Sequence, residues 1–421
     1  MLRTTRSKVR FNRALAMAIA LVGGTVTAST LIAPAAAAQE YTEGFVAAYN
    51  AVDAITKSGA TDFSSARPLL PAMLAAISNN DERNAAGRLL LAVGQNQRDP
   101  AMQRQAIELI LASGQVPVEA QAQYQYYIGN FAMQMSDFAA SRAALRLAIA
   151  GGYMPADAAQ NATFDPRTQI LQGYFIEEDY AGLMATAGEF VAAGGPSVPE
   201  QWLAYGLQAA IELQDLDNAS MFSQALVRQY PTNRNWGNAL RTITGLGDFD
   251  DQANLDLLRL MRLTGTIASR NEFASYVEAA DPRIMSNEVS DVLAEGLAAG
   301  EFTATETYYT EVKGIADDRM AGDRADAPIM VREARAAANG RDALLAGNLL
   351  YSLDDFAGAE EMFALAVSKG GVDTPTALTR LGIAQIRQGN NAAAIETLAQ
   401  VTGPRALIAQ MWSLYAAGQA G

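Results

Sequence analysis

The sequence contains no histidine and no cysteine among its 421 residues. Without these side chains the protein cannot build a Ser-His-Asp or Cys-His nucleophile, an imidazole base, or a zinc site with His or Cys ligands. Disulfides and a lipidated cysteine anchor are excluded for the same reason. Lysine is scarce after residue 38, and none of Lys57, Lys313 and Lys369 lies in a phosphate-binding motif. We therefore expect no catalytic site, no metal and no cofactor.

Carboxylates are the main reactive groups left, and they occur in short clusters such as Asp215 with Asp217 and Asp354 with Asp355. Paired carboxylates could serve glycoside hydrolysis or calcium binding. However, no calcium-loop spacing is present, and Asp137, Asp179 and Asp355 each stand just before an aromatic residue, between two helical patterns. An aspartate in that place accepts hydrogen bonds from the free N–H groups of the next helix. We interpret the acid clusters as helix caps.

The first 38 residues have the pattern of a secretory signal peptide. Five basic residues up to Arg13 precede an apolar stretch from Ala14 to Val22, and small residues from Ala36 to Ala38 form a cleavage site. We expect an exported, periplasmic protein, with a retained membrane anchor as the alternative. The formal net charge is −14 and becomes more negative once the basic leader is removed, which disfavours nucleic acid as a partner.

Apolar residues recur at helical spacing along the chain, for example over 41–57, 101–112, 200–213, 254–263 and 342–353. Gly, Pro, Asn or Asp interrupts this pattern every 12 to 20 residues, for example at Gly151-Gly152 and at Asp281-Pro282. Short helices joined by short turns favour antiparallel pairs. The sequence predicts an all-α fold.

Internal repetition supports this prediction. The stretch from Gly347 to Ala366 and the stretch from Gly129 to Ala148 share Gly, Asn, Asp, Phe and Ala at the same offsets. Small residues let two helices approach closely, and a larger residue fills the gap beside them. The sequence therefore predicts close contacts of Gly129 and Gly347 with a neighbouring helix, and a weaker unit in which Gly94 faces Ala106 and Ile110.

These small and aromatic positions resemble the repeat of the tetratricopeptide family. The pattern is carried by Gly347, Ala359, Phe363 and Ala366, by Gly382, Ala394, Leu398 and Val401, and by Trp202, Gly206, Phe222 and Ala225. Gly347 and Gly382 are 35 residues apart, and the repeat of the family is 34 residues long. The resemblance implies an α-solenoid of stacked antiparallel helix pairs.

The expected organisation is a signal peptide at 1–38, a helical repeat array at 39–316 with a degenerate middle part, a loop and connecting helix at 317–340, and tetratricopeptide-like repeats with a capping helix at 341–421. The charged segment from Asp317 to Asp326 is the expected loop.

The resemblance also implies that ligands bind the concave face formed by the first helix of each pair. The residues placed there are Tyr126, Asn130, Met133, Gln134, Arg341, Leu344, Asn348, Tyr351, Thr379, Ile383 and Arg387. Some family members hold a terminal carboxylate through a lysine on this face, but Tyr126 and Leu344 stand at that position here. Core packing between repeats is the alternative role for Tyr126, Met133, Tyr351 and Ile386.

The function expected from these features is a non-catalytic, periplasmic interaction module or scaffold that binds a protein or peptide. Two alternatives stay open: a carboxylate-based helical-barrel enzyme acting on cell-wall polysaccharide, and a self-assembling structural protein.

Overall fold

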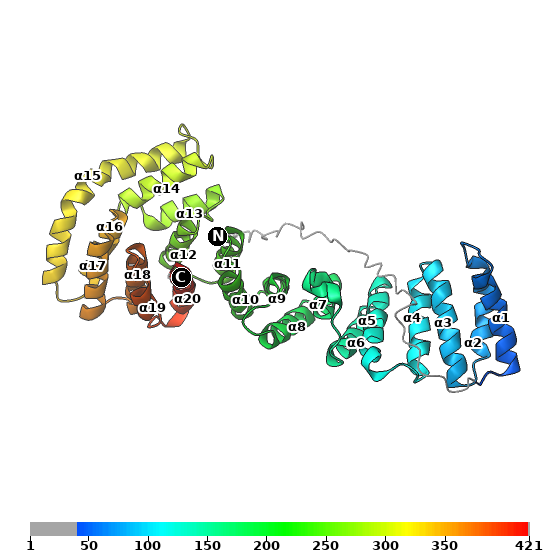
Figure 1. Cartoon of the computed structure of the whole chain (residues 1–421). Coiled ribbons are helices and arrows are strands. Elements are labelled where there is room, and N and C mark those ends of the chain that lie inside the picture. The colour runs from blue at the N-terminus through cyan, green and yellow to red at the C-terminus, as the bar shows by residue number, and fades with distance from the viewer. Residues whose placement is uncertain (1–39, 420–421) are drawn as a thin grey trace, which may run out of the picture. The chain divides into compact units, whose positions relative to one another are not determined.

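The computed structural model describes residues 40–419, and all regular structure in that range is helical (Figure 1). The predicted all-α helical-repeat fold is thus confirmed. The expected signal peptide lies outside the described residues. The chain divides into two compact units, unit 1 up to Asp179 and unit 2 from Tyr180.

In unit 1 the helices are α1 (Glu43–Lys57), α2 (Leu70–Ala75), α3 (Asn80–Asn96), α4 (Pro100–Ala112), α5 (Val118–Gln134), α6 (Phe138–Ala150) and α7 (Pro166–Ile176). Unit 2 contains α8 (Tyr180–Ala193), α9 (Glu200–Glu212), α10 (Leu216–Gln229), α11 (Asn233–Leu246), α12 (Asp251–Leu263), α13 (Arg270–Ala280), α14 (Ser286–Ala298), α15 (Thr307–Ala336), α16 (Arg341–Ser352), α17 (Phe356–Lys369), α18 (Thr374–Arg387), α19 (Asn391–Leu398) and α20 (Ala406–Gln419). Within each unit, every helix packs against the next along the chain.

Several helical hairpins share one turn geometry. A non-glycine residue with positive φ is followed by an aspartate whose carboxylate accepts a hydrogen bond from the first turn of the next helix. These pairs are Arg98-Asp99 before α4, Ser136-Asp137 before α6, Gln214-Asp215 before α10 and Asp354-Asp355 before α17. The prediction that Asp137 and Asp355 cap helices is confirmed.

Glycines set the distance between the two helices of a hairpin. A Cβ atom added to Gly129 would lie 2.6 Å from Cγ of Leu145, and one added to Gly347 would lie 2.6 Å from the ring of Phe363. Such distances are too short for a side chain, so only glycine allows this approach. The predicted contacts of both glycines are confirmed, and Gly206 and Gly382 repeat them against Phe222 and Leu398.

The expected register of the earlier repeat was wrong. Gly87, not Gly94, is the glycine that faces Ile110 and the backbone of Ala106. Gly94 lies two turns further along α3 and meets Met102 and Gln103 instead. The sequence offers two glycines seven residues apart on one helical face, and spacing alone could not choose between them.

The charged segment expected to be a loop is helical. Asp317 to Asp326 lies inside α15, a 30-residue helix. Its charges form pairs one turn apart, with Lys313 Nζ 2.7 Å from Asp317 and Arg319 Nη2 2.7 Å from Asp323. Such i,i+4 pairs support a helix. The Asp323 side chain is buried and accepts a hydrogen bond from Ser286 Oγ of α14 at 2.6 Å, so this part of α15 is packed against its neighbour.

Unit 2 differs from a simple stack because helices distant in sequence meet in its interior. The last helix, α20, packs against α10, α12 and α18, and α12 also packs against α18 (Figure 1). Every residue of α18 from Ala377 to Ile386 is buried. A helix buried on all sides in this way belongs to the core of the unit.

Candidate functional site

In unit 1 the predicted concave-face residues lie on one stretch of α5, where they are covered to different extents. Tyr126 is buried, and its hydroxyl donates a hydrogen bond to the Phe164 carbonyl at 3.0 Å. Asn130 and Met133 are half-buried, and Gln134 is exposed. The segment after α6 thus covers Tyr126, while the C-terminal part of α5 remains accessible.

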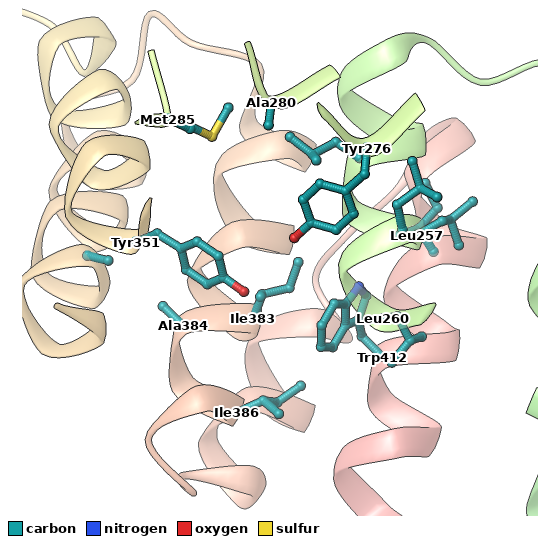
Figure 2. Packing of buried hydrophobic residues seen from close by; sticks show 14 of the residues in the cluster. Leu257, Leu260, Tyr276, Ala280, Met285, Tyr351, Ile383, Ala384, Ile386 and Trp412 are labelled. Atoms are coloured by element: carbon teal, nitrogen blue, oxygen red, sulfur yellow. The ribbon is translucent and has the colours of Figure 1, made fainter. Parts of the chain in front are cut away.

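In unit 2 the predicted residues separate into a buried and an accessible group. Buried are Asn348, Tyr351, Thr379 and Ile383, whereas Arg341 is exposed and Leu344 and Arg387 are half-buried. Other helices of the same unit cover the buried group. For example, the Arg259 guanidinium of α12 lies 4.4 Å from the ring centre of Tyr351. Figure 2 shows Tyr351, Tyr276 and Trp412, from three different helices, converging near Ile383.

A buried carboxylate at the centre of α12 joins these distant helices. Asp256 is fully buried, and its Oδ2 lies 2.5 Å from Nη1 of Arg405. Its backbone carbonyl accepts a hydrogen bond from the Trp412 indole at 2.9 Å. Two further arginines surround the same carboxylate: Arg259 at 3.1 Å and Arg380 at 3.5 Å. We call these residues the Asp256 cluster.

The charge of Asp256 is maintained by its neighbours. Burial alone would raise the pKa of the Asp256 carboxyl, but the guanidinium groups around it, Arg380 and Arg405 foremost, bring that pKa below its ordinary value. A buried carboxylate of this kind stays ionised only while its partners are in place. The Asp256 cluster therefore stabilises the packing of distant helices within unit 2.

A second buried carboxylate extends the network toward the surface. Both oxygens of Glu288 accept hydrogen bonds from Arg259, each at 2.8 Å, and Oε1 also accepts one from the Tyr276 hydroxyl at 2.6 Å. Burial alone would raise the pKa of Glu288, but Arg259 and the Tyr276 hydroxyl lower it below the ordinary value.

Beside this network lies a pocket of about 230 Å³. We call it the arginine pocket. Three arginines and two tyrosines form most of its wall, with one apolar and one acidic side chain: Arg259, Arg262, Arg387, Tyr276, Tyr351, Leu263 and Glu295. They come from α12, α13, α14, α16 and α18, so the pocket exists only when these helices are packed together.

The pocket chemistry suits recognition rather than proton transfer. Burial raises the pKa of Tyr276 well above its ordinary value and also raises that of Tyr351, so both phenols keep their protons near neutral pH. The Glu295 carboxylate is bound by Arg262, whose Nη2 lies 2.7 Å from Oε1. Guanidinium and phenol groups are hydrogen-bond donors that fix an acceptor in place.

Sequence reasoning placed Arg387 and Tyr351 in this region but missed Arg259, Arg262 and Tyr276. A signal for Arg259 exists in α12, where Asp256 and Arg259 interrupt an apolar run from Leu255 to Met261. Charged residues inside an apolar helix are buried only when they are paired, so this pattern predicts an internal ion pair. It does not reveal the partner helices.

A comparison with models of known protein families and with curated proteins found no match for this chain. Over residues 40–419, the structure has no helix that combines the length and apolar character of a membrane span. The fold places the protein in the class of all-α helical-repeat solenoids.

Proposed function

We propose that this protein is an exported, non-catalytic scaffold of the tetratricopeptide type that binds a protein or peptide partner in the periplasm. The observation that carries the proposal is the repeated close packing of helical hairpins at Gly129, Gly206, Gly347 and Gly382. Arrays of this kind present long, rigid surfaces formed by many side chains, and such surfaces are used for recognition.

We propose a binding surface in each unit, formed by accessible members of the predicted set and, in unit 2, also by the other residues of the arginine pocket. In unit 1 it includes Asn130, Met133 and Gln134 on α5. In unit 2 it includes Arg341 and the arginine pocket with Arg387. Nucleic acid and anionic membrane surfaces are disfavoured as partners because the net charge of the chain is −14.

Site-specific photo-crosslinking tests this proposal. A photoreactive amino acid replaces Gln134 on α5 or Arg341 on α16, and matched control positions are Ala139 on α6 and Ala364 on α17, which are also exposed but lie on the second helix of each hairpin. After irradiation of living cells, a discrete adduct from the α5 or α16 position, and none from α6 or α17, supports the proposal. The same products from all four positions, or none from any, would contradict it.

Export is tested separately. If the predicted signal is cleaved after Ala38, the mature protein begins at Gln39, and mass spectrometry of the N-terminal peptide from a periplasmic fraction detects that end. Recovery of the uncleaved chain in the membrane fraction would support the anchor alternative. Recovery in the cytoplasm would contradict export altogether.

A further inference from the structure

The three arginines of the arginine pocket differ in their carboxylate partners. Arg259 makes two hydrogen bonds of 2.8 Å to Glu288, and Arg262 donates to Glu295 from Nη2 to Oε1 at 2.7 Å and from Nε to Oε2 at 3.1 Å. Both are two-pronged arginine–carboxylate pairs, the geometry that the planar guanidinium favours.

Arg387 lacks such a pair. Within the described residues its nearest carboxylate is Asp354, at 3.8 Å, and the Asp354 side chain is 58% exposed. Among residues 40–419, the one side chain that accepts a hydrogen bond from Arg387 is Tyr351, through a long contact of 3.4 Å to its hydroxyl. The Arg387 side chain is itself only 27% exposed, so its guanidinium is partly removed from water while its counter-charge lies beyond hydrogen-bonding distance.

The Arg387 guanidinium is nevertheless held in a defined position. It lies 4.1 Å from the ring centre of Phe356 and 5.8 Å from that of Tyr351. Stacking on aromatic faces fixes the plane of a guanidinium and leaves its N–H edge free for an acceptor. Little side-chain freedom is lost when a ligand binds a group already held in this way.

A second hollow of about 310 Å³ adjoins the arginine pocket, and the two share Leu263 and Arg387 in their walls. Tyr415 and Asn391 line the far part of this hollow. Arg387 therefore lies at the junction of two hollows. A segment of polypeptide that passes through both would place a side chain next to this arginine.

We propose that these two hollows form one groove, and that the groove binds an extended segment of a partner protein with an aspartate or glutamate side chain seated on Arg387. The inference rests on the scaffold function proposed above and names the chemistry that its unit 2 site recognises. An incoming carboxylate would give Arg387 the two-pronged partner that Arg259 and Arg262 already have.

The acidic surface of the protein does not oppose this binding mode at physiological salt. The Debye length there is about 8 Å, so most surface carboxylates are screened from the groove. The acid nearest to Arg387, Asp354, is the one most open to water. Two-pronged, partly desolvated pairs are among the stronger charge interactions in proteins.

The test uses two capped peptides, Ac-Ala-Ala-Glu-Ala-Ala-NH₂ and its Gln analogue, with the purified protein and NMR detection of arginine Nε–H signals. We expect saturable binding of the Glu peptide in the millimolar range and at least a tenfold weaker response to the Gln peptide. Arg387→Gln should lower the affinity for the Glu peptide about tenfold. Arg387→Lys should give an intermediate affinity, because an ammonium group keeps the charge but cannot form the fork.

Arg335→Gln is the matched control, since it removes the same charge from α15 at a pair with Glu361 that is exposed on both sides. It should leave the affinity unchanged. Melting temperatures of all variants check that the fold is retained. Equal binding of the two peptides, or full affinity in Arg387→Gln, would overturn the inference. So would a preference for a peptide whose only carboxylate is at its C-terminus.

The outcome can be separated from that of the scaffold proposal. If photo-crosslinking from α5 or α16 identifies a partner and Arg387→Gln still binds that partner at full strength, the groove inference fails and the scaffold function stands.

Discussion

Units 1 and 2 both bury a carboxylate, but they stabilise it in different ways. In unit 1 the Glu82 side chain accepts hydrogen bonds from the backbone N–H and the hydroxyl of both Thr42 and Ser78, at 2.6 to 2.7 Å. All these donors are neutral and lie within 40 residues. In unit 2 Asp256 is surrounded by arginines, and the closest, Arg405, is 149 residues away.

The difference shows which parts of a repeat fold depend on the whole chain. Glu82 links α3 to the residues just before it and to the cap of α1. Asp256 links α12 to the residue that precedes α20 and to Trp412 within α20. We infer that unit 1 is stabilised mainly by local contacts, whereas unit 2 needs its last helix in place.

The largest effect is expected for Asp256→Ala. The change leaves buried arginines without their shared partner, and breaking a buried pair in this way costs about 3–5 kcal/mol. The three tryptophans, Trp202, Trp236 and Trp412, all belong to unit 2, so their fluorescence during urea unfolding reports on this unit. Asp291→Ala is the control, because that side chain is 48% exposed and comes no closer than 3.7 Å to Arg262, its nearest arginine. Equal stability of the two variants would contradict a stabilising role for Asp256.

The next largest effect is expected for tryptophan at the close-packed glycines. Gly129→Trp in unit 1 and Gly347→Trp in unit 2 both force a ring into a space already filled by Leu145 or Phe363. Overpacking of this kind costs about 3 kcal/mol or more. Gly314→Trp, in α15, is the matched control because no atom lies within 4 Å of the Cβ it would add. Thermal unfolding followed by circular dichroism should show lower melting temperatures for the first two variants only.

A smaller loss is expected for Glu82→Gln. Glutamine keeps one accepting oxygen, so the donors of either Thr42 or Ser78 lose their acceptor, at a cost of about 1–2 kcal/mol. Hydrogen exchange of α1 and α3 should become faster, while the exchange of unit 2 helices stays as it is. Loss of protection in α12 or α20 as well would contradict the local character of the Glu82 contacts.

The last prediction concerns pH. Burial alone would raise the pKa of Glu82, but its hydrogen bonds from Ser78 and Thr42 lower it to about 2, and the pKa of Asp256 is also lowered. A carboxylate whose pKa is lower in the folded state stabilises the fold above its unfolded pKa, near 4. This contribution is lost as the pH falls through the folded pKa. The free energy of unfolding should therefore decrease from pH 5 to pH 3.

The two substitutions separate the acid responses of the two units. Glu82→Gln should flatten the pH dependence measured by exchange in unit 1, and Asp256→Ala should flatten that measured by tryptophan fluorescence. A pH dependence left unchanged by both would mean that other carboxylates govern acid unfolding.

The features that the sequence predicted well are local. Helical periodicity, the caps at Asp137 and Asp355, and the close approach at Gly129 and Gly347 all depend on residues within one hairpin. Their physical causes act over a few turns of helix, so the spacing of residues records them directly. The register predicted for the weaker unit was wrong because it depended on a choice between Gly87 and Gly94, and spacing does not distinguish these two glycines.

The features that the sequence did not predict depend on contacts between distant helices. Ile383 fits the pattern of an inner repeat face, yet α12 and α20 pack against α18 in unit 2 and Ile383 is buried. Charge density alone also misplaced a loop at Asp317. The pairs Lys313–Asp317 and Arg319–Asp323 lie one turn apart within α15 and favour a helix, whereas the burial of Asp323 requires the neighbouring α14. The arginine pocket is assembled from five helices, and no single segment contains its pattern.

The distance along the chain between Asp256 and Arg405 also affects how the protein is made. Translation at about 5–20 residues per second separates the two by roughly 7–30 s, since they are 149 residues apart. During that interval the carboxylate has no Arg405 to pair with, and the indole of Trp412 has not yet been synthesised. The hairpins of unit 1 can form as they emerge, whereas unit 2 stays incomplete until its final helix arrives.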